Sequence, residues 1–205
     1  PDASPVSPYF GANFWKRWEW PANAELLEPE RTNTFNLPVG LQVHGNWSRT
    51  APQKSLELKA RSRYGAGKIR CAVFPGLALD EFDTLLLRNG GNDWYRALMR
   101  DGTLQSVTTG LSLGQQAIRP AHIFLNGQYN GIMQIRETAD QDHLAGHYSL
   151  PADELDVIFA EHQVVAGDPV AYNRLLMYVE TNDLALPTHY QTVTNQMDID
   201  NYIDY

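Results

Sequence analysis

The sequence lacks several features that would place it in a simple class. It has a single cysteine among 205 residues, which excludes an internal disulfide framework and a multi-cysteine zinc site. No apolar run approaches the roughly 20 residues that a membrane-spanning helix requires. Basic residues are also scarce, with 16 Lys and Arg against 24 Asp and Glu. The resulting net charge of -8 argues against nonspecific binding of nucleic acids or anionic membranes as the main role.

Apolar residues, in contrast, are abundant enough for a folded core. They make up 43% of the chain, whose length suits one large domain or two small lobes. The opening letters "PDASPVSPYF" contain no targeting signal, and their Pro and Ser content predicts a flexible leader over residues 1–13. The pattern of the remaining chain predicts a β-rich part over residues 14–137 and a more helical part over residues 138–205.

Two neighbouring segments of the first part are predicted strands. "FNLPVGLQVHGN" alternates apolar and polar residues and ends in Gly-Asn, which is typical of a strand followed by a turn. In "PQKSLELKARSRYG", Lys54 shares its parity with the apolar residues Leu56, Leu58 and Ala60. Side chains alternate between the two faces of a strand, so the pattern places this cation on the apolar face. We expect the two segments to form an antiparallel pair.

Other local signals complete the outline. The apolar run Leu85 to Leu87 predicts a buried strand, and residues 93–110 are predicted to be helical. Asn126-Gly127 lies between apolar runs, which predicts a hairpin of residues 123–125 and 132–135 with a type I′ turn.

The second part has clear helix starts. Asp168 followed by proline predicts the start of an amphipathic helix. Asp198 is expected to cap a last helix, "MDIDNYIDY". The apolar and aromatic face of that helix has no evident partner, so we expect the natural chain to continue past Tyr205.

Several candidates for chemistry are better explained by structure. His143 and His147 are four residues apart and can share a helix face, but zinc needs at least one more ligand and the zinc-protease pattern is absent. Cys71 has no identifiable base partner, and Ser48 lacks the glycine spacing of a nucleophile elbow. The three tryptophans of "FWKRWEW" are expected to cap a core rather than to bind a sugar. We therefore predict no metal site.

Lys54 allows two interpretations. The pattern alone favours a lysine at a strand entrance, with its stem on the core edge and its ammonium in water. The alternative is a strand lysine that holds ATP phosphates, as in protein kinases, and such a lysine needs a carboxylate to orient it. Asp101, on the following predicted helix, and Glu137, at the far end of the hairpin, are the candidate carboxylates.

Five blocks of sequence, in order, resemble one family. They are "GLQVHGNWSRTAPQKSLELKARSRYG", "VFPG", "DEFDTLLLRNGGND", "RPAHIFLNGQYNGIMQIRE" and "LAGHYSL". Together they are similar to the CotH family, the spore-coat-protein-H type of atypical protein kinase, and the similarity runs from about Trp18 to Tyr205. The resemblance implies an α+β, kinase-like fold. A β-rich N-lobe with an antiparallel sheet would bind ATP, and the chain would contain the start of a helical C-lobe.

The resemblance also implies roles for individual residues. Lys54 matches the family's strand lysine and is the candidate catalytic residue, and Arg49 matches a basic residue just before it. The segment from Gln134 through Arg136 to Glu137 matches the stretch after the hairpin, where a kinase connects its lobes. Asp101 is proposed by kinase logic as the partner of Lys54. Arg49, Lys54, Asp101, Gln134, Arg136 and Glu137 are thus the predicted nucleotide-binding residues.

In the complete parent, the cofactors implied are ATP and Mg²⁺, and the partner is a protein with Ser or Thr acceptors, such as a bacterial spore-coat or cell-surface protein. The family's catalytic and metal-binding aspartates are expected after Tyr205, so we predict that these 205 residues alone do not catalyse efficient transfer. The alternative is a noncatalytic surface or scaffold module that keeps the fold and binds a protein or a glycan. The tryptophans favour that alternative, as does Asn130, which stands where the family has a tryptophan.

Overall fold

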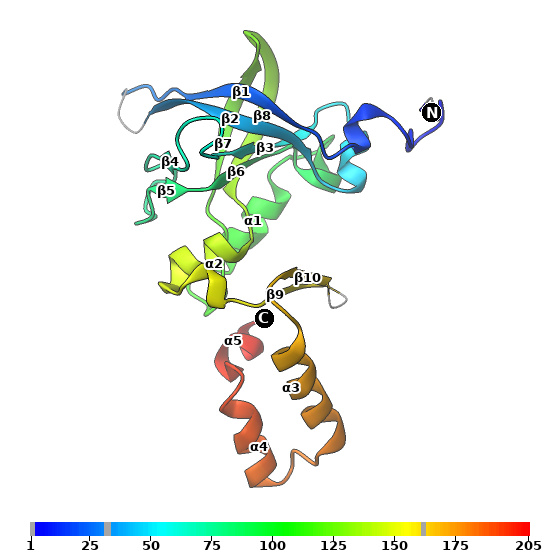
Figure 1. Cartoon of the computed structure of the whole chain (residues 1–205), viewed down its shortest axis with the longest axis vertical. Coiled ribbons are helices and arrows are strands. Elements are labelled where there is room, and N and C mark those ends of the chain that lie inside the picture. The colour runs from blue at the N-terminus through cyan, green and yellow to red at the C-terminus, as the bar shows by residue number, and fades with distance from the viewer. Residues whose placement is uncertain (1–2, 31–33, 161–162) are drawn as a thin grey trace. The chain divides into compact units, whose positions relative to one another are not determined.

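A computed structural model describes residues 3–30, 34–160 and 163–205 and gives an α+β fold, as predicted (Figure 1). Its strands are β1 (Glu19–Leu26), β2 (Phe35–His44), β3 (Ser55–Lys59), β4 (Ile69–Arg70), β5 (Glu81–Phe82), β6 (Thr84–Arg88), β7 (Ile118–Leu125), β8 (Gln128–Glu137), β9 (Val157–Phe159) and β10 (Gln163–Ala166). Its α-helices are α1 (Arg100–Val107), α2 (Gln141–Tyr148), α3 (Val170–Thr181), α4 (Pro187–Thr194) and α5 (Ile199–Asp204). Its 3₁₀ helices are η1 (Asn13–Trp15), η2 (Trp47–Thr50), η3 (Gly91–Asp93) and η4 (Ala152–Glu154).

The chain divides into two compact units. The first consists of Pro1–Val107 and Gln116–Thr138, and the second of Thr108–Gln115 and Ala139–Tyr205. Residues 1–2 of the predicted leader lie outside the described residues. The rest of that segment folds back on itself, because Ser4 N donates to Phe10 O at 2.8 Å and Trp15 Nε1 donates to Pro8 O at 2.8 Å.

The first unit is built on an antiparallel sheet in the order β1-β2-β3-β6-β8-β7. The predicted pair of neighbouring strands is therefore confirmed as β2 and β3. Each edge strand carries a proline, Pro21 in β1 and Pro120 in β7. Proline cannot donate a ladder hydrogen bond, so both edges are poor templates for pairing with another chain.

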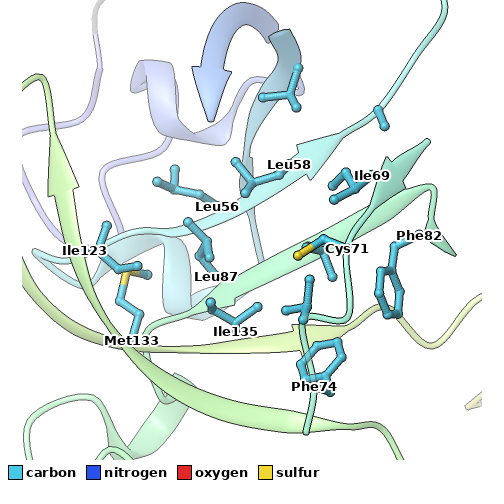
Figure 2. Packing of buried hydrophobic residues seen from close by; sticks show 14 residues of the cluster. Leu56, Leu58, Ile69, Cys71, Phe74, Phe82, Leu87, Ile123, Met133 and Ile135 are labelled. Atoms are coloured by element: carbon cyan, nitrogen blue, oxygen red, sulfur yellow. The ribbon is translucent and has the colours of Figure 1, made fainter. Parts of the chain in front are cut away.

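One face of this sheet carries the hydrophobic core (Figure 2). Leu56 and Leu58 of β3 point to the same side as Leu87 of β6 and Ile135 of β8, and β4, β5 and the loop between them supply Ile69, Cys71, Val73, Phe74 and Phe82. Leu56, Leu58 and Ala60 of "KSLELKA" thus lie on the core face, as their alternation predicts. The cluster accounts for almost all of the fully buried apolar side chains among the described residues.

The predicted hairpin is confirmed and is longer than expected. β7 and β8 meet at Asn126 and Gly127, whose φ angles of 50° and 78° are both positive, as a type I′ turn requires. The predicted helix over residues 93–110 is shorter than expected, because α1 begins only at Arg100. Asp93 explains the delay: its buried carboxylate accepts from the backbone N of Ala97 and Arg100 and holds the preceding residues in a loop.

The second unit contains α2 to α5 and the short β9–β10 hairpin. Asp198 caps α5 as predicted, accepting from Asn201 N at 2.9 Å. His143 and His147 share one face of α2, with ring centroids 4.3 Å apart. Among the described residues, no helix is long and apolar enough to cross a membrane.

Candidate functional site: the polar face of the sheet

The face of the sheet opposite the core is polar. The strand register places Gln42, Glu57, Leu86 and Arg136 in one row across β2, β3, β6 and β8, and residues directly opposite one another point to the same side. Arg88, two residues beyond Leu86, belongs to this face as well. Since charged side chains are rarely placed on a half-buried sheet without a role or a partner, this face is the candidate site.

Arg88, Asp101 and Arg136 form an ion-pair cluster on this face. Arg88 Nε lies 3.1 Å from Asp101 Oδ2, and Arg136 Nη1 donates to the same oxygen. Gln116 Oε1 accepts from the other terminal nitrogen of Arg136. The Arg136 side chain is only 6% exposed, whereas those of Arg88 and Asp101 are 30% and 33% exposed. Arg88 is therefore the cation that a ligand can reach.

The charges of this cluster are strongly coupled. Burial raises the pKa of Asp101, but the nearby guanidinium groups of Arg136 and Arg88 outweigh burial and lower it overall. Burial lowers the pKa of Arg136, and Asp101 opposes that change. At neutral pH the cluster therefore holds two cations against one anion, and its excess positive charge is suited to an anionic ligand.

The sequence "RNGGND" builds the loop that places Arg88. Asn89 is fully buried and ties the loop to the start of β3, because its amide donates to Gln53 O at 2.6 Å and its Oδ1 accepts from Ser55 Oγ at 2.9 Å. A Cβ at Gly91 would lie 2.8 Å from Arg88 Nη2, and φ there is +60°. The positive φ favours glycine at this position, and a side chain here would also displace the end of the Arg88 guanidinium.

A second polar cluster lies on the same face, between β2 and β3. Glu57 Oε1 is 2.8 Å from His44 Nδ1, and Glu57 Oε2 is 3.0 Å from Lys59 Nζ. Lys59 also donates to Gln42 Oε1 at 2.7 Å. Burial raises the pKa of Glu57, but the hydrogen bonds and charges of His44 and Lys59 outweigh it and lower the pKa to about 2. Glu57 is thus a fixed, ionised carboxylate.

This shift predicts an acid-sensitive contribution to stability. The pKa of Glu57 in the folded protein lies below its ordinary value of 4.5, so its stabilising contribution is complete above about pH 4.5 and is lost as the pH falls towards 2. We expect Glu57→Gln to lower the urea midpoint at pH 6 and to reduce the loss of stability between pH 4.5 and pH 2.5. Glu81→Gln, which removes an exposed carboxylate on β5, is the control. An unchanged acid dependence in Glu57→Gln would contradict the assignment.

Comparison with known protein families shows which family this chain belongs to. The model described as CotH kinase protein matches residues 41–205, which is most of the chain. The chain belongs to the CotH kinase family. This confirms the resemblance inferred from the five sequence blocks. A search of curated proteins found no match.

Two of the residues predicted from the CotH pattern, Lys54 and Arg49, make their closest contacts with residues outside the ion-pair cluster. Lys54 precedes β3, donates to Ala51 O at 2.5 Å and has its ammonium 4.3 Å from the centroid of the Phe14 ring. Arg49 is buried and donates to Gly45 O and to Phe14 O, at 2.5 and 3.0 Å. Burial lowers the pKa of both side chains. Their contacts fasten the aromatic N-terminal segment to the η2 loop.

The expected ion pair of Lys54 with Asp101 does not occur within the described structure, because Asp101 is paired with Arg88 and Arg136. The physical reason is that Lys54 lies outside β3 and finds the Phe14 ring and a backbone carbonyl close by. Asp101 does lie on the helix that follows the buried strand, and Arg136 joins it. These two predicted residues are thus brought together.

Gln134 and Glu137 are the remaining predicted residues, and both are buried. Gln134 lies on the polar face opposite Arg88 and donates through Nε2 to Leu98 O, at the loop before α1. Glu137 accepts from Ala117 N at 2.7 Å and holds the start of β7 against the end of β8. Gln134 therefore borders the ion-pair cluster, and Glu137 supports the sheet end.

Neither Arg88 nor Glu57 is among the site residues that the sequence predicts. Arg88 directly follows a fully apolar run and precedes Asn-Gly-Gly. A charged residue at the end of a strand is common at a protein surface, so the position alone does not indicate a functional role. The alternation places Glu57 on the polar side of its strand, but it does not distinguish a solvated carboxylate from one held by His44 and Lys59. The sequence feature that could have indicated a role for Arg88 is its position next to the Gly-Gly turn.

Proposed function

We propose that the first unit of this CotH family member binds the phosphates of ATP through Arg88, with Asp101 and Arg136 holding Arg88 in place. In the complete protein, the γ-phosphate would pass to Ser or Thr of a partner protein. On the family resemblance alone, we propose bacterial coat or surface proteins as acceptors.

The observation that carries this proposal is the Arg88–Asp101 pair. In protein kinases a strand lysine holds the ATP phosphates and is oriented by a glutamate on the helix that follows. Here the strand before α1 is β6, its cation is Arg88, and the carboxylate on α1 is Asp101, 3.1 Å away. The arrangement matches that logic with arginine and aspartate in the two roles. Arginine also offers a planar fork that suits phosphate oxygens.

Arg136 stabilises the Arg88–Asp101 pair through its own contact with Asp101. Its guanidinium is fixed by Asp101 and Gln116, so the aspartate cannot swing away from β8 without leaving a buried charge unpaired. Asp101 is thereby held beside Arg88, with its Oδ2 3.1 Å from Arg88 Nε. We propose that Arg136 and Asp101 position Arg88 and that Arg88 contacts the ligand.

Phosphoryl transfer also needs divalent metal and acidic residues that bind it. We assign no residue of this chain to Mg²⁺, because the carboxylate of Asp101 is engaged by two arginines and that of Glu57 by His44 and Lys59. The family resemblance implies that aspartates would hold the metal, which would neutralise charge on the phosphates.

Thermal stability in the presence of Mg-ATP tests the proposal. A ligand that binds only the folded state at about 100 times its Kd stabilises it by about 2.7 kcal/mol, which is roughly 5 to 10 °C in Tm for a chain of this size. We expect such a shift for Mg-ATP at millimolar concentration, and a smaller one for AMP. No shift in a folded sample would overturn the proposal.

A second candidate function rests on the aromatic cluster of the N-terminal segment. Phe10, Trp15 and Trp47 have ring centroids 5.4 to 6.2 Å apart, and Phe10 and Trp47 are more than half exposed. Trp18 and Trp20 are also about half exposed, so these tryptophans do not form the fully covered core cap that the sequence predicted. Such a surface favours a noncatalytic module that binds a protein or a glycan. Glycan-array binding without any Mg-ATP shift would favour this candidate.

A further inference from the structure

Glu57 has a geometry that the phosphate site alone does not explain. It lies directly opposite Leu86 in the β3–β6 ladder, and Arg88 is two residues further along β6. Glu57 and Arg88 are therefore diagonal neighbours on one sheet face, about 7–8 Å apart between their backbones. A ligand held by Arg88 and lying across β6 and β3 would reach Glu57.

The carboxylate is held rigidly. His44 on β2 and Lys59 on β3 each contact a different oxygen, and Gln42 holds Lys59 in turn. All four residues belong to the polar face and come from regular strands rather than from loops. The side chain of Glu57 is 13% exposed, so it is not fully closed off from solvent. This is the preorganisation expected of a binding group.

The chemistry of the Glu57 carboxylate limits which part of a ligand it can bind. An ionised carboxylate accepts hydrogen bonds and donates none, and each of its oxygens has two lone pairs, so His44 and Lys59 do not exhaust it. It repels phosphate, which leaves a hydroxyl or amine donor as its partner. In a nucleotide whose phosphates lie at Arg88, the hydrogen-bond donors nearest to the phosphates are the ribose hydroxyls. A carboxylate that accepts from a ribose 2′-hydroxyl is an established solution in other nucleotide-binding folds.

We propose that Glu57 accepts a hydrogen bond from the ribose 2′-hydroxyl of the nucleotide and so selects ribonucleotides over 2′-deoxyribonucleotides. The inference rests on the proposed ATP site at Arg88. His44 and Lys59 are positioning residues in this arrangement, because they orient Glu57 and keep it ionised.

Calorimetric titration of the 205-residue chain with Mg-ATP and with Mg-2′-deoxy-ATP tests the inference. A hydrogen bond to a charged group corresponds to a preference of about tenfold or more for ATP. We expect this preference in the wild type, and we expect it to fall to about threefold in Glu57→Gln, because the neutral amide oxygen still accepts a hydrogen bond but about half as strongly. Glu81→Gln, the control on β5, should keep the wild-type ratio.

The outcomes are distinguishable. If neither nucleotide binds the wild type, the ATP site itself is wrong and the inference fails with it. If both nucleotides bind the wild type equally, only the role of Glu57 is overturned, and that measurement needs no variant. If Glu57→Gln does not fold, Glu57→Asp keeps the charge but shortens the side chain, and an undiminished ATP preference in that variant would also overturn the inference.

Discussion

Replacement of Arg88 by alanine is expected to weaken Mg-ATP binding by about ten- to a hundredfold, which is the effect of losing one or two charge-assisted hydrogen bonds to phosphate. At a fixed ATP concentration, the stabilisation by ligand should shrink accordingly or vanish. Lys54→Ala is expected to leave the ATP-induced shift in place, because the Lys54 ammonium lies over the Phe14 ring and donates to Ala51 O. Isothermal titration of both variants at equal ionic strength measures the difference.

Two further variants sharpen that experiment. Arg88→Lys keeps the charge but not the planar fork, so an intermediate affinity is expected. Arg70→Ala removes an exposed arginine on β4 that pairs with Glu81, and it should behave as the wild type. The opposite result, a loss of binding in Lys54→Ala with Arg88→Ala unaffected, would restore Lys54 as the phosphate-binding cation that the sequence pattern predicts.

Much of the fold follows from local sequence signals. Leu85 to Leu87 predicted a buried strand, and the structure buries all three. Asn126-Gly127 predicted its hairpin because few other residue pairs adopt two positive φ angles in succession. The alternation in "KSLELKA" correctly separated Leu56 from Glu57. Each of these signals depends only on neighbours in the chain.

The candidate site depends on pairings that are remote in sequence. Arg88 acquires its role from Asp101 on α1 and from Arg136 on β8, and neither contact has a local signature. Lys54 shows the converse. Counting by twos places Lys54 on the same strand face as Leu56. The β2–β3 ladder begins only at Ser55, however, so Lys54 lies outside the strand and the alternation of side chains does not determine where it points. Its environment is set by Phe14, some forty residues earlier in the chain. A family resemblance transfers the fold more safely than the role of one side chain.

Asp101→Asn is expected to destabilise the first unit by about 3 kcal/mol, the lower end of the cost of breaking a buried ion pair, because Asp101 itself is one-third exposed. The variant leaves the buried Arg136 and the neighbouring Arg88 with no anion between them. Guanidinium chloride denaturation measures the loss. Glu81→Gln removes one partner of the exposed Arg70 pair and should cost at most about 1 kcal/mol. A loss of that small size in Asp101→Asn would show that the cluster is solvated.

A double variant separates the structural role of this cluster from its role in binding. Replacing both partners of a buried ion pair by apolar residues is often neutral or stabilising, because the cost of burying the charges disappears with them. Asp101→Leu combined with Arg136→Met should therefore recover most of the stability lost in Asp101→Asn. Arg88 would remain in that variant, but without the carboxylate that orients it. If Asp101 and Arg136 act by positioning Arg88, the folded double variant binds Mg-ATP weakly. If it binds Mg-ATP as tightly as the wild type, Arg88 needs no positioning, and the kinase-like pairing is only structural.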